Sequence, residues 1–306
     1  MGTTYSIIIS SLDINIKSAD DIKHKVDSTL KSINMQMSTY IASSEISKFN
    51  KSTTMDIVPS SNFLDVLKYG RELSESTGGM FDITVAPLVD LWGFSHEKSP
   101  WVPPDRLDVI RLLDKIGNDT WDILNGKLIK IKPDIEINVN AIAKGFGVDI
   151  ISTLLRSIGY KNFMVEIGGE VFCSGLNHKG ELWKIGVELP KFHSRTLDKV
   201  ASLSNVAMAT SGDYRNYYSY NGKNYSHTIN PKSGIPIEHS LASVTVISNT
   251  CMSADGLATA LLVMGTEQAI NYIEKINLAE CLLVERDENG QFRSFMSSGF
   301  GEYLIE

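Results

Sequence analysis

The sequence predicts an α+β fold with a β-rich body and helices packed against it, and three observations support this class. Apolar residues recur at helical spacing at several places before residue 160 and again after residue 250. Between these stretches, short β-branched and aromatic runs are separated by turn residues, as is typical of strands. No internal repeat, low-complexity segment or clear linker divides the 306 residues, a length that allows one large domain or two.

Composition and charge exclude some classes of protein. Hydrophobic residues make up 42% and charged residues 21% of the chain, as in ordinary globular proteins. The net charge of −7 argues against a nucleic-acid binder, and three scattered cysteines do not suffice for a disulfide framework or a zinc site. No apolar run is long enough for a membrane span, and no signal peptide precedes the first strand pattern. We expect either a cytoplasmic protein or an exported one without its targeting segment.

In the first half, a β-branched run predicts a strand over residues 3–11. Helical spacing predicts helices from about Asp20, over residues 62–77 and over residues 105–116, and the pair Asn125-Gly126 predicts a hairpin over 121–131. Tyr40 stands among small hydroxyl residues in a polar stretch, and it is either a half-buried loop aromatic or a stacking platform for a planar ligand.

Asp82 lies inside an apolar run, where an acid needs a partner. It is either a strand-end acid bonded to backbone or an acceptor for a heterocyclic ligand.

Residues 135–160 predict a strand followed by a helix. The alternation in IEINV indicates the strand, Asn140 is the expected N-cap, and the helix runs to about Ile158. Lys144 lies near the helix N-terminus, where free N–H groups and partial positive charge suit a phosphate. Taken alone, a lysine on a solvated helix face is the simpler interpretation.

The second half is β-rich. Two strands are interrupted by Gly168-Gly169, and further strands follow as far as residue 248. His227 lies at a strand end before the NPKSG turn, with Ser211 and Arg215 near in sequence, so it is a candidate for catalysis as well as for a structural role.

A helix follows, with Ser253 as the expected N-cap and Gly265 as its stop signal. Asp255 in the first turn and Thr259 four residues later share one face, where their oxygens can hold a hard cation such as Mg²⁺. Alternatively, Asp255 only complements the helix dipole and Thr259 only bonds to a carbonyl.

Eight segments together resemble the ApbE-type FAD:protein FMN transferases, or flavin transferases. In chain order they are MGTTY, STYIASSEISKFN, GGMFDITVAPLVDLWGF, INVNAIAKGFGVD, VEIGGEVFCSG, ATSGDYRNYY, YSHTINPKSGIP and CMSADGLATA. Because they cover nearly the whole chain, the resemblance implies a single domain over residues 1–306 and a two-lobed α+β fold with an FAD cleft between the lobes.

The resemblance also implies an activity: Mg²⁺-dependent transfer of FMN from FAD to a Thr or Ser hydroxyl of an acceptor flavoprotein, with release of AMP. Asp255, Thr259 and the carbonyl of Ala141 would bind the metal, and His227 would act as base. The implied FAD site comprises Met1, Tyr40, Met80, Phe81, Asp82, Asn138, Lys144 and Ile229.

Two departures from the family pattern concern Asn138 and Asn140, where many members have Asp and Gly or Ser.

FAD pyrophosphatase members resemble a variant with Asn at the Tyr40 position, so Tyr40 favours transfer. A non-catalytic FAD-binding protein is the other alternative, although storage needs neither a base nor a metal.

The resemblance implies an acceptor such as a subunit of a Na⁺-pumping or related redox complex. It also implies a place in the cell envelope, on the periplasmic or extracytoplasmic face, with lipid anchoring through an absent N-terminal segment as the only membrane contact. A cytoplasmic location stays open.

Overall fold

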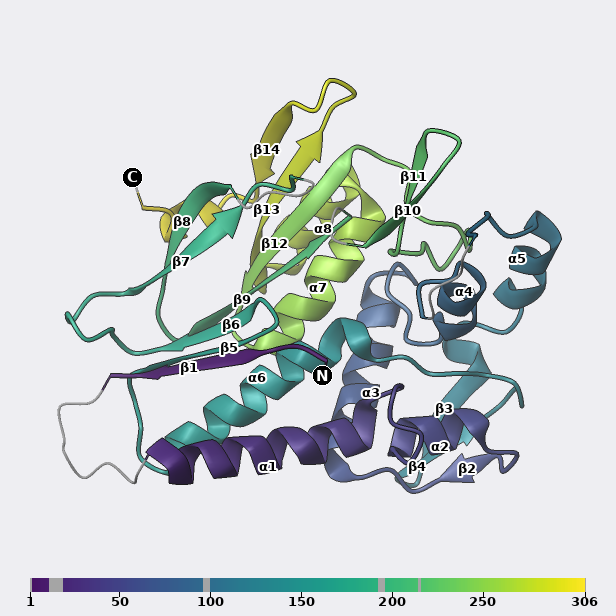
Figure 1. Cartoon of the computed structure of the whole chain (residues 1–306), viewed down its shortest axis with the longest axis horizontal. Helices are drawn as coiled ribbons and strands as arrows, with labels where there is room; N and C mark the ends of the chain where they lie inside the picture. The colour runs from purple at the N-terminus through teal and green to yellow at the C-terminus, as the bar shows by residue number, and fades with distance from the viewer. Residues whose placement is uncertain (1, 11–18, 96–99, 192–195, 214–215, 306) are drawn as a thin grey trace.

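A computed structural model of the protein describes all residues except 1, 11–18, 96–99, 192–195, 214–215 and 306 (Figure 1). Its centre is a seven-stranded antiparallel sheet in the order β1-β5-β6-β9-β12-β13-β14. These strands are β1 (Tyr5–Ile9), β5 (Phe163–Ile167), β6 (Glu170–Ser174), β9 (Val206–Gly212), β12 (Leu241–Ser248), β13 (Ala279–Arg286) and β14 (Phe292–Met296). The predicted α+β class is confirmed.

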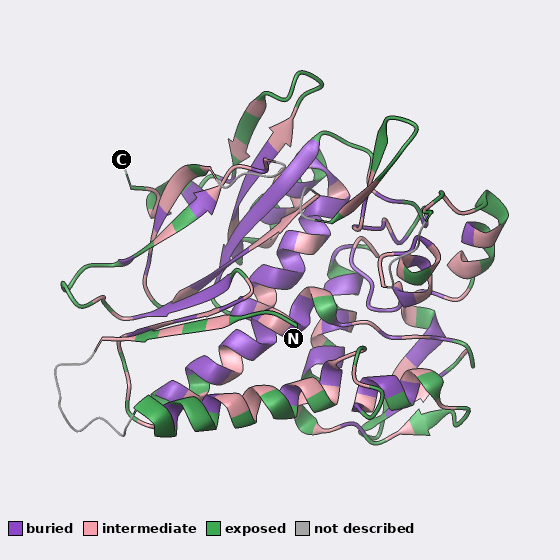
Figure 2. Ribbon diagram, in the orientation of Figure 1, coloured by how far each residue is buried: buried purple, intermediate pink, exposed green. Residues whose placement is uncertain are grey.

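Layers of structure cover both faces of this sheet. On one face lie α6 (Asn140–Ser157) and α7 (Cys251–Met264), with α1 (Ala19–Met37), α3 (Ser61–Ser76) and α8 (Thr266–Ile276) around them (Figure 1). The other face packs on the ribbon β7 (Trp183–Glu188) and β8 (Leu197–Leu203) and on η2 (Phe300–Tyr303). Because both faces are covered, every residue of β12 is buried, whereas α1 keeps an exposed outer side (Figure 2).

A smaller group of elements lies beside the helical layer. It contains α2 (Glu45–Lys51), α4 (Ala86–Leu91), α5 (Arg106–Leu113), η1 (Asn118–Thr120) and a sheet of β2 (Asp56–Ile57), β4 (Lys127–Lys130) and β3 (Trp121–Leu124). The hairpin of β10 (Tyr217–Tyr220) and β11 (Lys223–Ser226) lies above α4 in Figure 1, and the Tyr218 hydroxyl donates to the carbonyl of Gly93 just after α4 at 3.0 Å. Asn125 (φ 52°) and Gly126 (φ 76°) both adopt left-handed backbone, which confirms the predicted β3–β4 turn.

Residues 135–139 do not form the predicted strand. The amide of Ile137 donates to Asn50 Oδ1 at 2.9 Å, and that of Asn138 donates to the carbonyl of Ile83 at 2.7 Å. The backbone is therefore satisfied by separate partners instead of one neighbouring strand. The side chains nevertheless alternate between the core and the cavity, because Ile135 and Val139 are buried while Asn138 lines a cavity.

Two helix starts differ from the prediction. Ser253 is not the N-cap of α7. The cap is Thr250, whose Oγ1 accepts from the Ser253 amide at 3.2 Å, so the helix begins three residues earlier than predicted, at Cys251. Asp255 therefore lies beyond the first turn. Asn140 is the first residue of α6 rather than its cap, and its amide donates to Asn138 Oδ1 at 2.9 Å.

The polar stretch around Tyr40 contains the helix α2, which the sequence did not predict. Ser44 is its N-cap, and the Ser44 Oγ accepts from the Ser47 amide at 3.1 Å. In the part of the chain that the structure describes, no helix is both long and apolar enough to cross a membrane.

Candidate active site

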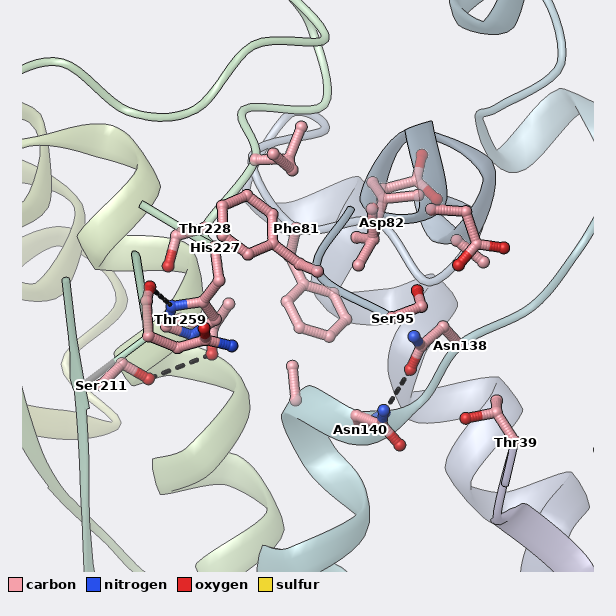
Figure 3. Close-up of a pocket in the computed structure, with 18 of the residues that line it drawn as sticks. Thr39, Phe81, Asp82, Ser95, Asn138, Asn140, Ser211, His227, Thr228 and Thr259 are labelled. Atoms are coloured by element: carbon pink, nitrogen blue, oxygen red, sulfur yellow. Dashed lines mark hydrogen bonds between the residues drawn. The ribbon is translucent and has the colours of Figure 1, made fainter. Parts of the chain in front are cut away.

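One cavity of about 840 Å³ opens between α6 and α7 on one side and the segments around α2 and α4 on the other (Figure 3). Every candidate residue that the structure describes lines this cavity: Tyr40, Met80, Phe81, Asp82, Asn138, Ala141, Lys144, His227, Ile229, Asp255 and Thr259. Met1 and Arg215 lie outside the described residues. Segments around Ala141, His227 and Asp255, far apart in sequence, thus meet at one site.

The buried end of the cavity contains two carboxyl groups and one ammonium group. Asp255 is 3% exposed, and its Oδ2 accepts from the Gly145 amide at 3.0 Å. Lys144 Nζ lies 3.4 Å from Asp255 Oδ1 and 3.3 Å from Glu170 Oε1. Two carboxyl groups that share one ammonium favour the approach of a further cation.

Burial is the largest influence on these three groups. It raises the pKa of Asp255 and of Glu170, and the charge of Lys144 acts in the opposite direction on both. Burial alone would lower the pKa of Lys144, but the two carboxylates outweigh it and the pKa is raised. Lys144 is therefore a partly buried lysine that stays charged at neutral pH.

Glu170 was not singled out by the sequence analysis. It is the first residue of β6 and is only 4% exposed. The available signal was an acid directly after Gly168-Gly169 that opens the otherwise apolar run VFC.

Thr259 lies on the same face of α7 as Asp255, as the four-residue spacing predicts, and both line the cavity. Its Oγ1 is 3.1 Å from Ser211 Oγ on the neighbouring strand β9 (Figure 3). The hydroxyl therefore points out of the helix toward the sheet side of the cavity.

His227 follows β11 directly and is partly buried. Its Nδ1 lies 3.0 Å from the carbonyl oxygen of Asn216, and the ring meets Phe94 edge-on at 6.4 Å between centroids. A carbonyl only accepts, so Nδ1 carries the proton in the neutral ring and Nε2 is left with a lone pair. Burial lowers the pKa of His227, which keeps the ring neutral and able to accept a proton.

The opposite wall is largely apolar and includes Met80, Phe81 and Ile229, the last two almost fully buried. Tyr40 is 74% exposed at the rim, so the interpretation as a half-buried loop aromatic is wrong. Asp82 does not end a strand: its Oδ1 accepts from the amide and hydroxyl of Thr84 at 2.7 and 2.6 Å, in a turn before α4. Burial raises the pKa of Asp82.

The model of the ApbE family matches residues 1–283. This chain belongs to the ApbE family.

Relatives in the ApbE family match over almost the full length. The FAD:protein FMN transferase of Vibrio cholerae is 39% identical over 99% of this chain and 90% of its own length. That of Haemophilus influenzae is 41% identical over 98% of this chain and 88% of its own length. The solved structure of the flavin transferase ApbE from Vibrio cholerae superposes with a TM-score of 0.90 at 37% identity, covering 99% of this chain and 96% of that one.

Proposed function

We propose that this protein is an FAD:protein FMN transferase and that FAD binds in the cavity with its pyrophosphate next to Lys144. The relatives in the ApbE family carry this name. The observation that supports the site is the meeting of a charged lysine, a buried acid and a neutral histidine, Lys144, Asp255 and His227, in one cavity. Phosphoryl transfer needs these properties, because charge must be offset on the phosphates and a nucleophile must lose a proton.

The donor set at the buried end suits a divalent cation such as Mg²⁺. The Asp255 carboxylate, the Thr259 hydroxyl and the Ala141 carbonyl all line the cavity and offer oxygen, which hard cations prefer. Among the described residues no three His, Cys, Asp or Glu side chains gather as a metal-binding group, so such an ion would depend on Asp255 and neutral oxygens. When bound, Mg²⁺ would neutralise charge on the pyrophosphate.

The chain's own residues account for binding and proton transfer. The Lys144 ammonium attracts the phosphates, and the wall of Met80, Phe81 and Ile229 receives the flavin ring. His227 Nε2 takes the proton of the acceptor hydroxyl. The hydroxyl oxygen then forms a bond to the FMN phosphorus, the phosphoanhydride bond breaks, and AMP leaves with the bonding electrons.

The acceptor is inferred from the family resemblance alone. We expect a flavoprotein with a reactive Thr or Ser, such as a subunit of a Na⁺-pumping or related redox complex. We expect it at the extracytoplasmic face of the cell envelope.

One experiment tests this function. The protein is incubated with FAD, Mg²⁺ and an acceptor domain, and covalent flavin on the acceptor and AMP in solution are measured. Transfer predicts both products together, and both depend on the acceptor. AMP that forms equally without acceptor would show hydrolysis, and bound FAD without turnover would show a binding protein.

Asp255→Ala tests the cation site in the same assay. We expect the variant to lose Mg²⁺-dependent turnover, whereas Asp65→Ala, at an exposed position of α3, should retain it. Full Mg²⁺-dependent turnover of Asp255→Ala would contradict the assignment of Asp255.

A further inference from the structure

Glu170 is a buried acid of the cavity to which the proposed mechanism gives no role. Its side chain lines the cavity, and only one of its carboxyl oxygens, Oε1, contacts Lys144. The other oxygen, Oε2, is buried and has no hydrogen-bond partner among the residues that the structure describes. Leaving a buried carboxyl oxygen unpaired is costly, so Oε2 can accept from a donor that moves toward it.

The Lys144 stem is directed toward Glu170 by the turn between β5 and β6. Gly168 adopts left-handed backbone (φ 66°), and a Cβ there would lie 3.3 Å from Lys144 Cδ and 2.9 Å from Thr3 Cγ2. A side chain at Gly168 would therefore crowd the lysine stem, besides being strained at this positive φ. The Lys144 ammonium then meets Glu170 at the first position of β6.

Lys144 also contacts the residue that would bind the cation. Its Nζ lies 3.4 and 3.5 Å from the two oxygens of Asp255, so the ammonium contacts both oxygens that could bind a divalent ion. The two positive charges would repel each other at short range. Lys144 thus needs another anionic partner once Asp255 engages a cation.

We propose that Glu170 is this partner: it holds the Lys144 ammonium when Asp255 binds a divalent cation, and so lets both positive charges stay in the site. This inference rests on the proposed function, because it assumes the cation. The ammonium has three donors, and Glu170 Oε2 offers the acceptor that the retreating Lys144 would use. Glu170 is a positioning residue, since it acts through Lys144.

A double-mutant cycle tests the proposal by calorimetric titration with Mg²⁺ alone. With Glu170→Gln, Lys144 keeps only Asp255 as a carboxylate partner and competes with the ion, so Mg²⁺ affinity should fall about tenfold. In the Lys144→Gln background no ammonium competes, and Glu170→Gln should change the affinity by less than about threefold. Equal losses in both backgrounds would overturn the proposal and make Glu170 a simple source of negative charge.

Glu170→Asp separates position from charge. It keeps the charge but draws the carboxyl group back from Lys144, so we expect weakened Mg²⁺ binding, whereas an unchanged affinity would contradict the positioning role. Thermal unfolding shows whether Glu170→Gln still folds. If it does not, Glu170→Asp takes its place in the double-mutant cycle.

The matched control is Glu238→Gln, which breaks an exposed Glu–Lys pair, 2.6 Å between Glu238 Oε1 and Lys223 Nζ, and should leave Mg²⁺ affinity unchanged. A wild-type protein without Mg²⁺ affinity would contradict the cation site itself. Normal wild-type affinity with an additive cycle would contradict only the role of Glu170.

Discussion

The backbone N–H of Gly145 on α6 donates to the buried carboxylate of Asp255 on α7 at 3.0 Å. In return, α6 accepts two hydrogen bonds from α7. The amides of Cys251 and Met252 donate to the two carboxylate oxygens of Asp149 at 2.8 and 2.9 Å. Each helix therefore binds the backbone of the other through an acid. In a regular helix the Gly145 N–H would donate to the Ala141 carbonyl, which is also a candidate cation ligand. The Asp255 carboxylate and the Ala141 carbonyl therefore compete for the same N–H donor.

Gly145→Ala should push α6 and α7 apart. A Cβ at Gly145 would lie 2.3 Å from the Cys251 carbonyl oxygen, a backbone atom that cannot move without moving α7. We expect a loss of about 1–3 kcal/mol in the free energy of unfolding, together with weaker FAD binding, measured by urea unfolding and flavin fluorescence. Gly301→Ala is the control, because nothing lies within 4 Å of its added Cβ and stability should stay unchanged. Wild-type stability and FAD affinity in Gly145→Ala would refute the close contact.

Asp149→Asn should destabilise the start of α7. An amide has one acceptor oxygen where the carboxylate has two, so the Cys251 or the Met252 N–H is left unpaired at a cost of about 1–3 kcal/mol. Asp65→Asn, at an exposed position, should have little effect on the free energy of unfolding.

The stability contributed by Asp149 also depends on pH. Burial raises its pKa from 3.8 to about 6, against the effect of the two amides, so the folded protein binds this proton more tightly than the unfolded chain. The free energy of unfolding should therefore fall as pH rises from about 4 to about 6, and this part of the slope should be absent from Asp149→Asn. A slope that is identical in the two proteins would contradict the raised pKa.

The features that local patterns encode were predicted well. The predicted hairpin at Asn125-Gly126 formed, because both residues adopt the left-handed backbone that its turn requires. The two strands predicted on either side of Gly168-Gly169 also formed, and they pair with each other across these glycines. Asp255 and Thr259 share a cavity because helical spacing alone places them on one face.

The features that were missed depend on contacts distant in sequence. Ser253 was a reasonable cap for α7, but Asp149, about a hundred residues earlier, satisfies two of the free amides and lets the helix begin sooner. IEINV alternates like a strand, yet Asn50 and Ile83 take its backbone bonds. The pairing of Glu170 with Lys144 could not be read from either segment alone, because it exists only once β6 lies beside α6.

His227 should set the acidic limb of the pH profile for transfer. Burial lowers its pKa below the ordinary 6.5, and the neutral ring is the form that accepts a proton. We expect kcat/KM for the acceptor to stay constant as the pH falls to 6.5 and to decline only at a lower pH, where His227 becomes protonated. His227→Ala should lose transfer but still bind FAD, and His178→Ala, an exposed histidine, should match the wild type. A limb centred above 6.5 would assign the titration to another group.

Tyr40→Asn should raise FAD hydrolysis relative to transfer. Tyr40 stands 74% exposed at the cavity rim, where its ring can cover bound flavin and keep water from the pyrophosphate. The shorter, polar Asn would leave that rim open to water. We expect AMP release without acceptor to increase several-fold, about tenfold for each 1.4 kcal/mol of barrier removed. Tyr220→Asn, which alters an exposed tyrosine outside the cavity lining, should leave this background rate unchanged. If Tyr40→Asn and wild type release AMP equally in the absence of acceptor, Tyr40 does not control the choice between water and the acceptor hydroxyl.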